Sequence, residues 1–248
     1  MNKRVNILLI LLLFAFAAPF ALQAQKKKQK NQTQKTEEKR YLQAEVLDSI
    51  GEISQYNKLI PSLHGDSVRR FPNGEKLQGW KEDYYKSGSL LHKGFYKDGQ
   101  LELFKNFWES GKMERVMAVI DSNHTNLEVY YESGNQRKQI NYYKGEIKRF
   151  SEFYPNNLLK LIEEYDENSA LLLKKKTWFV NGHIESELVL LDQKSKKYKL
   201  NTYHSSGKPA ESGIQFPAKN GQGFIRSGTW TIQDSTGKKK SKTFGPAK

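Results

Sequence analysis

One turn signal recurs at nearly constant spacing through most of this chain. In ten successive places an aromatic or large apolar residue stands three positions before a glycine or asparagine, and these glycines and asparagines are 11 to 14 residues apart. Glycine and asparagine tolerate the positive φ of tight hairpin turns. A short strand followed by such a turn uses roughly 11 to 12 residues, so the spacing predicts a series of β-hairpins. The pairs are Phe71/Gly74, Tyr85/Gly88, Tyr96/Gly99, Trp108/Gly111, Ile120/Asn123, Tyr131/Gly134, Tyr142/Gly145, Tyr154/Asn157, Tyr165/Asn168 and Phe179/Gly182.

Aromatic doublets accompany many of these turns. Because side chains alternate along a strand, a doublet places one ring on each face of a sheet. Hairpins with rings on both faces can pack mainly on their neighbours. The sequence therefore predicts an all-β fold, an elongated, twisted antiparallel meander of short hairpin repeats that is mostly single-layered. A closed barrel or a sandwich remains an alternative. The doublets are Tyr84-Tyr85, Phe95-Tyr96, Phe107-Trp108, Tyr130-Tyr131 and Tyr142-Tyr143.

The ends of the chain differ from its body. Lys3 and Arg4 precede an apolar run over 7–18, and Ala24 offers a small residue for cleavage. This order predicts a signal peptide over 1–24 and an exported protein, periplasmic or associated with the outer envelope, with an uncleaved anchor as the alternative. Residues 25–43 read as a polar basic linker. The repeat array is expected over 44–245, with 183–201 as its least regular part.

The net charge of +14 belongs mostly to the two tails. Residues 1–40 hold nine basic and two acidic residues, a net of +7, and the basic C-terminal tail 238–248 adds five lysines. The body between them is therefore only +2, which argues against a nucleic-acid partner. The chain has no cysteine, so disulfides and thiol chemistry are excluded.

Several units resemble a known repeat. Residues 85–90 with 95–101, 108–113 and 131–135 are similar to the bacterial variant of the MORN repeat, and a closing unit holds Trp230 and Gly237. The resemblance is to YwqK-like proteins, described as antitoxin components of toxin–antitoxin systems, in the exported type of Bacteroidota. It implies a partner-binding role, with protein or phospholipid as the bound class, and it carries over no catalytic residue.

No pattern in the chain points to catalysis. The histidines do not form a metalloprotease pair, and phosphate-loop, dinucleotide and nucleophile-elbow motifs are absent from the sequence. We expect no catalytic, metal or cofactor site. The leading hypothesis is a non-catalytic scaffold that binds an unknown protein partner. An envelope module for glycan or anionic phospholipid is the alternative, and an antitoxin- or immunity-like neutralising partner is the second. The histidines are His64, His92, His124, His183 and His204.

Overall fold

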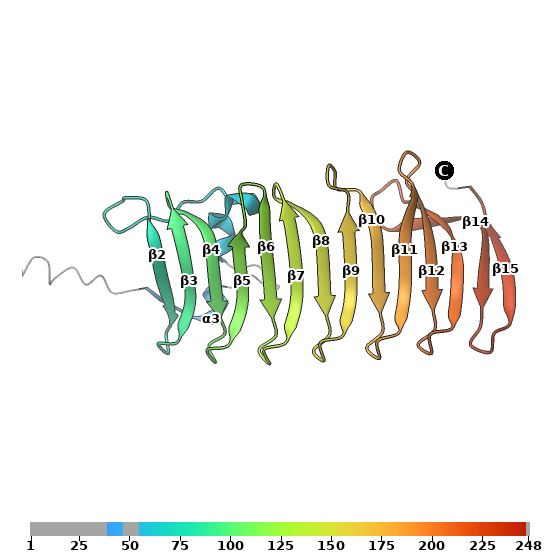
Figure 1. Cartoon of the computed structure of the whole chain (residues 1–248), viewed down its shortest axis with the longest axis horizontal. Coiled ribbons are helices and arrows are strands. Elements are labelled where there is room, and N and C mark those ends of the chain that lie inside the picture. Colours follow the sequence, from blue (N-terminus) through green and yellow to red (C-terminus); the bar gives the residue numbers. More distant parts are fainter. Residues whose placement is uncertain (1–38, 47–54, 247–248) are drawn as a thin grey trace, which may run out of the picture. The chain divides into compact units, whose positions relative to one another are not determined.

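The strands follow one another in a single open sheet. This computed structural model describes residues 39–46 and 55–246, and within them each of fifteen strands pairs with the next strand along the chain (Figure 1). The predicted all-β meander is confirmed. The sheet does not close on itself, which decides against the barrel. The predicted signal peptide and residues 25–38 of the linker lie outside the described residues.

The strands have similar lengths, apart from the first. The first two strands are parallel to each other, and every later pair is antiparallel. Their bounds are β1 Arg40–Tyr41, β2 Gly79–Tyr85, β3 Leu90–Lys97, β4 Gln100–Phe107, β5 Met113–Val119, β6 His124–Tyr130, β7 Gln136–Tyr143, β8 Glu146–Phe153, β9 Leu159–Tyr165, β10 Leu172–Trp178, β11 Ile184–Asp192, β12 Lys197–Tyr203, β13 Pro209–Pro217, β14 Phe224–Gln233 and β15 Lys239–Phe244.

The lower turns of the sheet share one hydrogen-bond pattern, whereas the upper turns vary. In the lower turns of Figure 1 the first residue donates its N–H to the carbonyl four residues later, as Tyr131 does to Asn135 at 2.8 Å. Two upper turns are two-residue hairpins with positive φ at both positions, 50° and 78° at Asp98-Gly99 and again at Lys144-Gly145. One full repeat is therefore two strands, and lower turns begin at 85, 108, 131 and 154, each 23 residues after the last.

A row of hydrogen bonds joins successive lower turns. The hydroxyl of the tyrosine that begins one turn donates to a backbone carbonyl just before the next turn. Tyr85 donates to Phe107 at 2.8 Å, and Tyr131 donates to Phe153 at 2.9 Å. Tyr154 continues the row to Trp178 at 2.7 Å. These rings therefore stabilise the stacking of one repeat on the next.

Replacing Tyr154 with phenylalanine should lower the free energy of unfolding by about 1 kcal/mol, because one partly buried hydrogen bond is lost while the ring remains. Chemical denaturation would measure the change. Tyr143→Phe is the matched control, since its hydroxyl makes no hydrogen bond within the described part of the chain. Equal stability of both variants would contradict the bonding role of Tyr154. The chain already carries phenylalanine at the equivalent position, 179.

The segment before β2 does not continue the array. It forms the short helices α3 (Gln43–Val46), η1 (Gln55–Leu59) and η2 (Pro61–Leu63), and the antiparallel series of strands begins only at Gly79, later than the expected start of the array at 44. Tyr56, Ile60 and Leu77 pack against buried residues of the sheet such as Phe104. Figure 1 shows these helices behind the first strands. Pro61 cannot donate to a strand ladder and instead begins η2, which helps explain the change.

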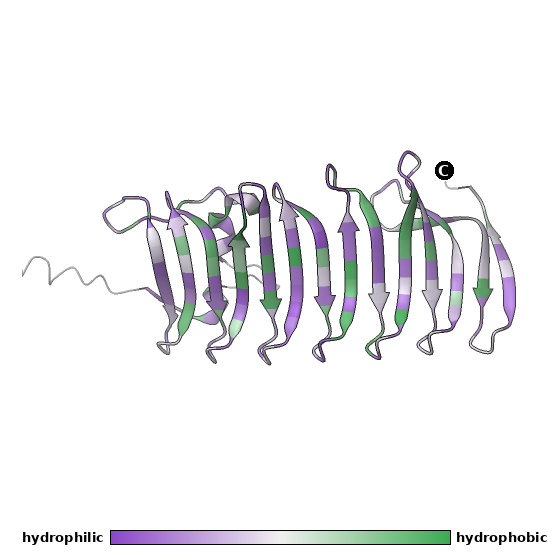
Figure 2. Cartoon of the chain, in the orientation of Figure 1, coloured by the Kyte–Doolittle hydropathy of each residue, from purple (hydrophilic) through white to green (hydrophobic). Residues whose placement is uncertain are grey.

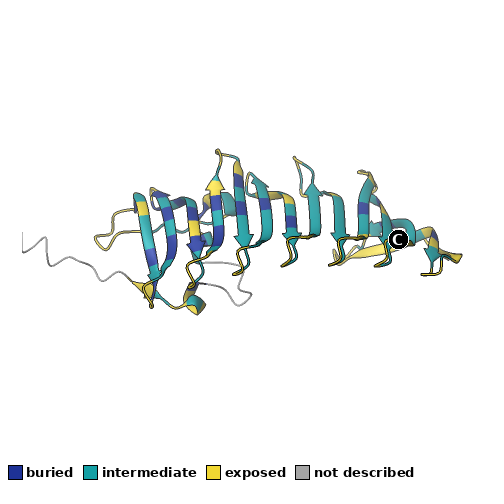
Figure 3. Ribbon diagram, turned by 60° about the horizontal axis from the view of Figure 1, so that its bottom comes forward, coloured by how far each residue is buried: buried dark blue, intermediate teal, exposed yellow. Residues whose placement is uncertain are grey.

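The core lies mainly in the first half of the sheet. Figure 3 shows most of the fully buried residues in the strands near η1 and η2, whereas later strands are mostly half-buried. Figure 2 shows hydrophobic and hydrophilic residues alternating along many strands, as expected where successive side chains point to opposite faces of a sheet. Residues 183–201, expected to be the least regular part, form the well-paired strands β11 and β12.

Candidate functional site

The sheet has two unlike faces. We call the face on which Tyr56 and Ile60 pack the covered face. Its central row pairs Phe104 with Met117 and continues through β6, β7 and β8. This apolar row ends where Glu163 of β9 pairs with Lys175 of β10, at 2.8 Å. We call the opposite face the open face. It is turned toward the viewer in Figure 1, and none of the described helices lies over it.

The repeat places one aromatic side chain on the open face at every second strand. The residue before each lower turn lies on this face because side chains alternate along a strand. The residues that directly precede these positions, such as Asp83 and Asn106, point to the covered face. Neighbouring strands are about 4.8 Å apart, so successive rings are separated by about 10 Å. Each of these side chains is half-buried. We name them the aromatic band: Tyr84, Phe107, Tyr130, Phe153, Trp178 and Tyr203.

Charged side chains stand beside the aromatic band. Tyr84 donates to Glu82 at 2.6 Å, and Lys93 donates to the other oxygen of Glu82 at 2.9 Å. These hydrogen bonds, the one from Tyr84 first, hold the pKa of the Glu82 carboxyl below its usual value. Tyr130 donates to Glu128 at 2.5 Å. The open face therefore combines rings with oriented carboxylates and ammonium groups.

Trp80, on the same strand as Tyr84, extends this surface along β2 away from the lower turn. Its side chain is 57% exposed, the ring packs edge-on against Phe95, and the Lys93 ammonium lies 5.6 Å from its centroid. On β10, Lys176 lies 5.4 Å from the ring of Trp178. Arrangements of half-exposed aromatic rings, polar partners and cations are typical of binding surfaces in proteins.

The residues singled out from the sequence have structural positions rather than one common site. Tyr85, Trp108, Tyr131, Tyr154 and Phe179 begin lower turns. Tyr96 is buried on the covered face, Tyr142 packs against the same core, and Trp230 is buried near the C-terminal end. Phe71 begins a turn outside the sheet, with Gly74 completing it. Positive φ is found at Gly74, Gly88, Gly99, Gly111, Gly134, Gly145, Gly182 and Gly237.

The aromatic band itself was not singled out by the sequence, although a signal for it was present. All of its members except Tyr203, which precedes His204, are the first residues of doublets such as Tyr84-Tyr85 and Tyr130-Tyr131, whose second residues carry the turn signal. The two rings of a doublet point in opposite directions, and the hydroxyl of the second, as in Tyr131, bonds to the neighbouring repeat. Alternation predicts opposite directions, but only the position of η1 and η2 shows which face stays open.

A buried polar network lies beneath η1. Asp83 receives two hydrogen bonds from the Arg69 guanidinium, at 2.5 and 2.7 Å, and one from the Tyr56 hydroxyl at 2.9 Å. Arg69 also donates to the Tyr96 hydroxyl at 2.9 Å, and that oxygen lies 3.0 Å from Nε2 of His92. Nδ1 of His92 is 2.7 Å from Oδ1 of an asparagine on β4. The network ties the N-terminal segment to strands β2, β3 and β4.

Burial governs the protonation of this network. It lowers the pKa of His92 to about 4, although the hydrogen bond to Asn106 works in the opposite direction. Burial also raises the pKa of Tyr96 to about 12 despite the nearby Arg69. For Asp83 burial favours the neutral acid, but the hydrogen bonds and charge of Arg69 hold its pKa below the usual value. A neutral imidazole that accepts from Tyr96 and donates to Asn106 satisfies these distances.

Protein stability should therefore fall as the pH is lowered from 7 toward 4.5. His92 is neutral in the folded state down to about pH 4, whereas the unfolded chain takes up the proton near its ordinary value of 6.5. The unfolded state then binds more protons, so the stabilisation is complete above pH 6.5 and about 2–3 kcal/mol is lost by pH 4.5. Asp83 contributes only at lower pH. Urea denaturation of the wild type and of His92→Gln across this pH range would measure the loss of stability. If the stability of the variant depended on pH as steeply as that of the wild type, His92 would not be its source.

Three other described histidines serve local structure. His183 contacts the carbonyl of Ser205 through Nδ1 at 2.8 Å, and His204 contacts the carbonyl of Gln233 through Nε2 at 2.9 Å. His124 lies 2.8 Å from Asp121 at the end of a turn. Within 39–46 and 55–246, no group of three or more histidine or acidic residues is arranged to hold a metal ion.

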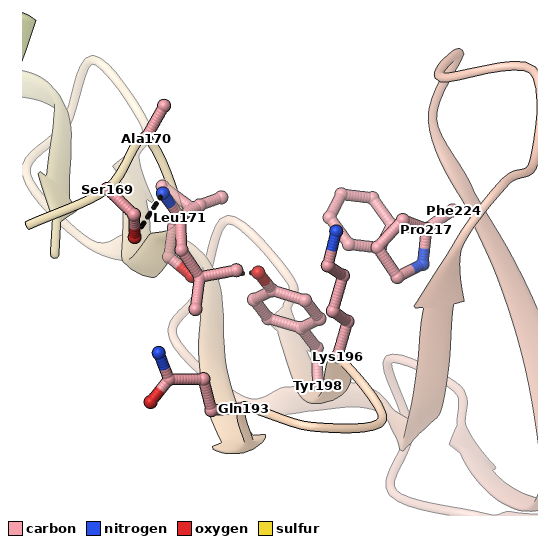
Figure 4. A pocket seen from close by; sticks show the side chains of 9 residues that line it. Ser169, Ala170, Leu171, Gln193, Lys196, Tyr198, Pro217 and Phe224 are labelled. Carbon is pink, nitrogen blue, oxygen red and sulfur yellow. Dashed lines mark hydrogen bonds between the residues drawn. The ribbon is translucent and has the colours of Figure 1, made fainter.

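An open depression lies among the upper loops of the second half. Its volume is about 590 Å³, and Figure 4 shows Lys196, Tyr198 and Phe224 around it. The Tyr198 ring packs edge-on against Phe224, and its hydroxyl donates to the Leu172 carbonyl at 2.8 Å. Because Tyr198 is buried and already bonded, it is oriented for packing rather than for contact with a ligand.

Comparisons with known proteins do not assign this chain to a family. No protein-family model and no curated protein matches it. One similar solved structure is a crystal structure of TarM, with 12% identity and a TM-score of 0.27, covering 36% of this chain and 18% of TarM. Another is an S. aureus TarM mutant in complex with fondaparinux, alpha-GlcNAc-glycerol and UDP, with 11% identity and a TM-score of 0.28, covering 46% of this chain and 20% of that one. This chain thus spans about a fifth of each TarM chain.

Proposed function

We propose that this protein is a non-catalytic, exported repeat scaffold that binds a protein partner on the open face of its sheet. The observation that carries the proposal is the aromatic band, a row of half-buried rings held at regular spacing beside charged residues such as Glu82 and Lys93. Aromatic residues supply much of the binding energy at protein interfaces, and polar neighbours supply specificity. The repeat itself we propose to be a variant of the bacterial MORN repeat.

The rigidity of the surface supports this role. Each band residue lies on a strand hydrogen-bonded on both sides, and the lower turns are linked by bonds such as that from Tyr131 to Phe153. A partner would therefore meet rings that are already fixed in place, which lowers the entropy cost of binding. A periplasmic or envelope location is part of the same proposal and depends on the signal peptide expected over 1–24.

Paired variants of the band test the proposal. Tyr130→Ser combined with Trp178→Ser should abolish the capture of a specific partner by cross-linking in envelope extracts. Phe71→Ser is the matched control, because Phe71 is 40% exposed but lies outside the sheet. Denaturation curves must show that the double variant stays folded. Capture of the same proteins by all three forms, or of none by the wild type, would count against an open-face partner.

A glycan is the second candidate for the open face. Rings repeat every second strand, at about 10 Å, and could stack on successive units of a linear sugar chain. Titration of the full chain with purified envelope polysaccharides, with and without the Tyr130 and Trp178 substitutions, distinguishes the two candidates. For anionic phospholipid the described surface offers the exposed lysines over 238–242 rather than the aromatic band, and no comparable feature of the described surface favours an antitoxin- or immunity-like role.

A further inference from the structure

The two end strands of the sheet differ in how they are covered. At the beginning, β1 pairs with the outer side of β2, matching Tyr41 with Tyr85, and Lys86 donates to the Tyr41 carbonyl at 3.0 Å. At the other end, β15 pairs with β14, and no described strand pairs with its outer side. Figure 1 shows β15 as the last strand of the row. The beginning of the sheet is therefore covered by β1 at Tyr84 and Tyr85, whereas β15 has no described strand on its outer side.

The register identifies the backbone groups that face outward from β15. Asp234 donates its N–H to the Lys238 carbonyl at 3.1 Å, and hydrogen-bonded pairs alternate along an antiparallel ladder from that point. Residues 240, 242 and 244 consequently bond to β14. The N–H and C=O groups of Lys239, Ser241 and Thr243 point away from the sheet. All three residues are exposed, so these donors and acceptors are accessible to another strand.

The positive charge of β15 determines which kind of strand can pair with its outer side. Lys238, Lys239, Lys240 and Lys242 lie within or beside β15, and neither β14 nor β15 contains an acidic residue. None of these lysines forms an ion pair within the described part of the chain. A second copy of this edge would bring two lysine-rich strands together, and like charges on adjacent strands are destabilising. An extended segment carrying carboxylates would instead gain attraction on both faces.

We propose that β15 is a docking edge for an extended acidic segment of another polypeptide, which adds to the sheet as a further strand. Its backbone would pair with Lys239, Ser241 and Thr243, and its carboxylates would lie beside Lys240 and Lys242. Main-chain bonds would supply affinity and the lysines selectivity, as in other cases of strand addition. This edge is distinct from the aromatic band. The docking proposal rests on the proposed function only in that the partner is a polypeptide.

The probe is a fluorescent peptide of alternating glutamate and valine, as long as β15, titrated against the full chain. Ser241→Pro removes one outward N–H without removing a bond to β14, and it should weaken binding by about tenfold or more. Ser235→Pro is its matched control, because Pro155 occupies the equivalent turn position. Lys240→Glu with Lys242→Glu should have a similar effect, whereas Lys194→Glu with Lys219→Glu, in the upper loops, should not.

Several results would overturn the proposal: no binding of the acidic peptide, undiminished binding to Ser241→Pro, or equal binding of a glutamate–proline peptide that cannot pair as a strand. A concentration-dependent dimer that Ser241→Pro dissociates would show that a second copy occupies the edge instead. Tyr130→Ser with Trp178→Ser should leave peptide binding unchanged. Failure at the edge can thus be told apart from failure of the open-face proposal.

Discussion

Replacing Asp83 with alanine is expected to lower the free energy of unfolding by about 3–5 kcal/mol, because removing one partner of a buried ion pair leaves the other charge uncompensated. The Asp83 carboxylate is 2% exposed and accepts hydrogen bonds from Arg69 and Tyr56. Its loss also removes the bonds that hold the N-terminal segment on β2. We expect residues 55–77 to detach from the sheet before the strands unfold, which amide hydrogen exchange would detect.

Glu82→Ala is the matched control for this prediction. Glu82 is the neighbouring acid on the same strand and also forms an ion pair, but both it and Lys93 are more than a third exposed. Exposed pairs contribute about 1 kcal/mol or less. If Asp83→Ala and Glu82→Ala were equally stable, the buried network would not be what fixes the N-terminal segment. Arg69→Met combined with Asp83→Leu should recover part of the stability, because no isolated charge remains.

Replacing Trp230 with alanine should also cost about 3–5 kcal/mol, for a different reason. The Trp230 side chain is fully buried, and its indole N–H donates to the Ile214 carbonyl at 3.1 Å. The ring lies against Gly213, where any side chain would collide with it, and the Arg226 guanidinium lies 4.3 Å from its centroid. Gly213→Val should therefore be destabilising as well, by about 1–3 kcal/mol.

The loss of stability in Trp230→Ala should be confined to the C-terminal strands, because each strand contacts mainly its neighbours. Hydrogen exchange in Trp230→Ala should accelerate in β13, β14 and β15 and stay slow in β3 and β4. Trp80→Ala is the control, since a side chain that is 57% exposed should contribute less than about 1 kcal/mol. A uniform acceleration of exchange across the whole sheet would contradict this prediction of local unfolding.

The sheet could be predicted from the sequence because each of its turns is specified by residues that are close together in the chain. Each lower turn needs a residue with positive φ three positions after its first residue, and Gly88, Gly111 and Gly134 provide it. Short connections of this kind leave antiparallel neighbours as the simplest arrangement. Which turns would share one form was not evident from the sequence, because Tyr96/Gly99 and Tyr131/Gly134 have the same spacing in sequence but different hydrogen bonds.

The two faces could not be told apart in the same way. Doublets predict rings on both faces, whereas the distinction between covered and open depends on Tyr56 and Ile60, which lie far from their partners in sequence. The pairing of Arg69 with Asp83 is likewise a contact between a loop and a strand, without a periodic signal. Contacts across such distances depend on tertiary packing and leave no local pattern to read.

The two-strand repeat also sets a rule for changes in chain length. Inserting or deleting a full unit of about 23 residues keeps the direction of every later strand, so all lower turns stay on the same side of the molecule, at the same ends of the strands. Removing a single strand with its turn would reverse the direction of everything that follows, and tyrosines such as Tyr131 and Tyr154 would reach the wrong neighbours. A gene encoding such a sheet can therefore lengthen or shorten by duplication and loss of hairpins, and the length of the binding surface becomes a property that natural selection can adjust in whole steps.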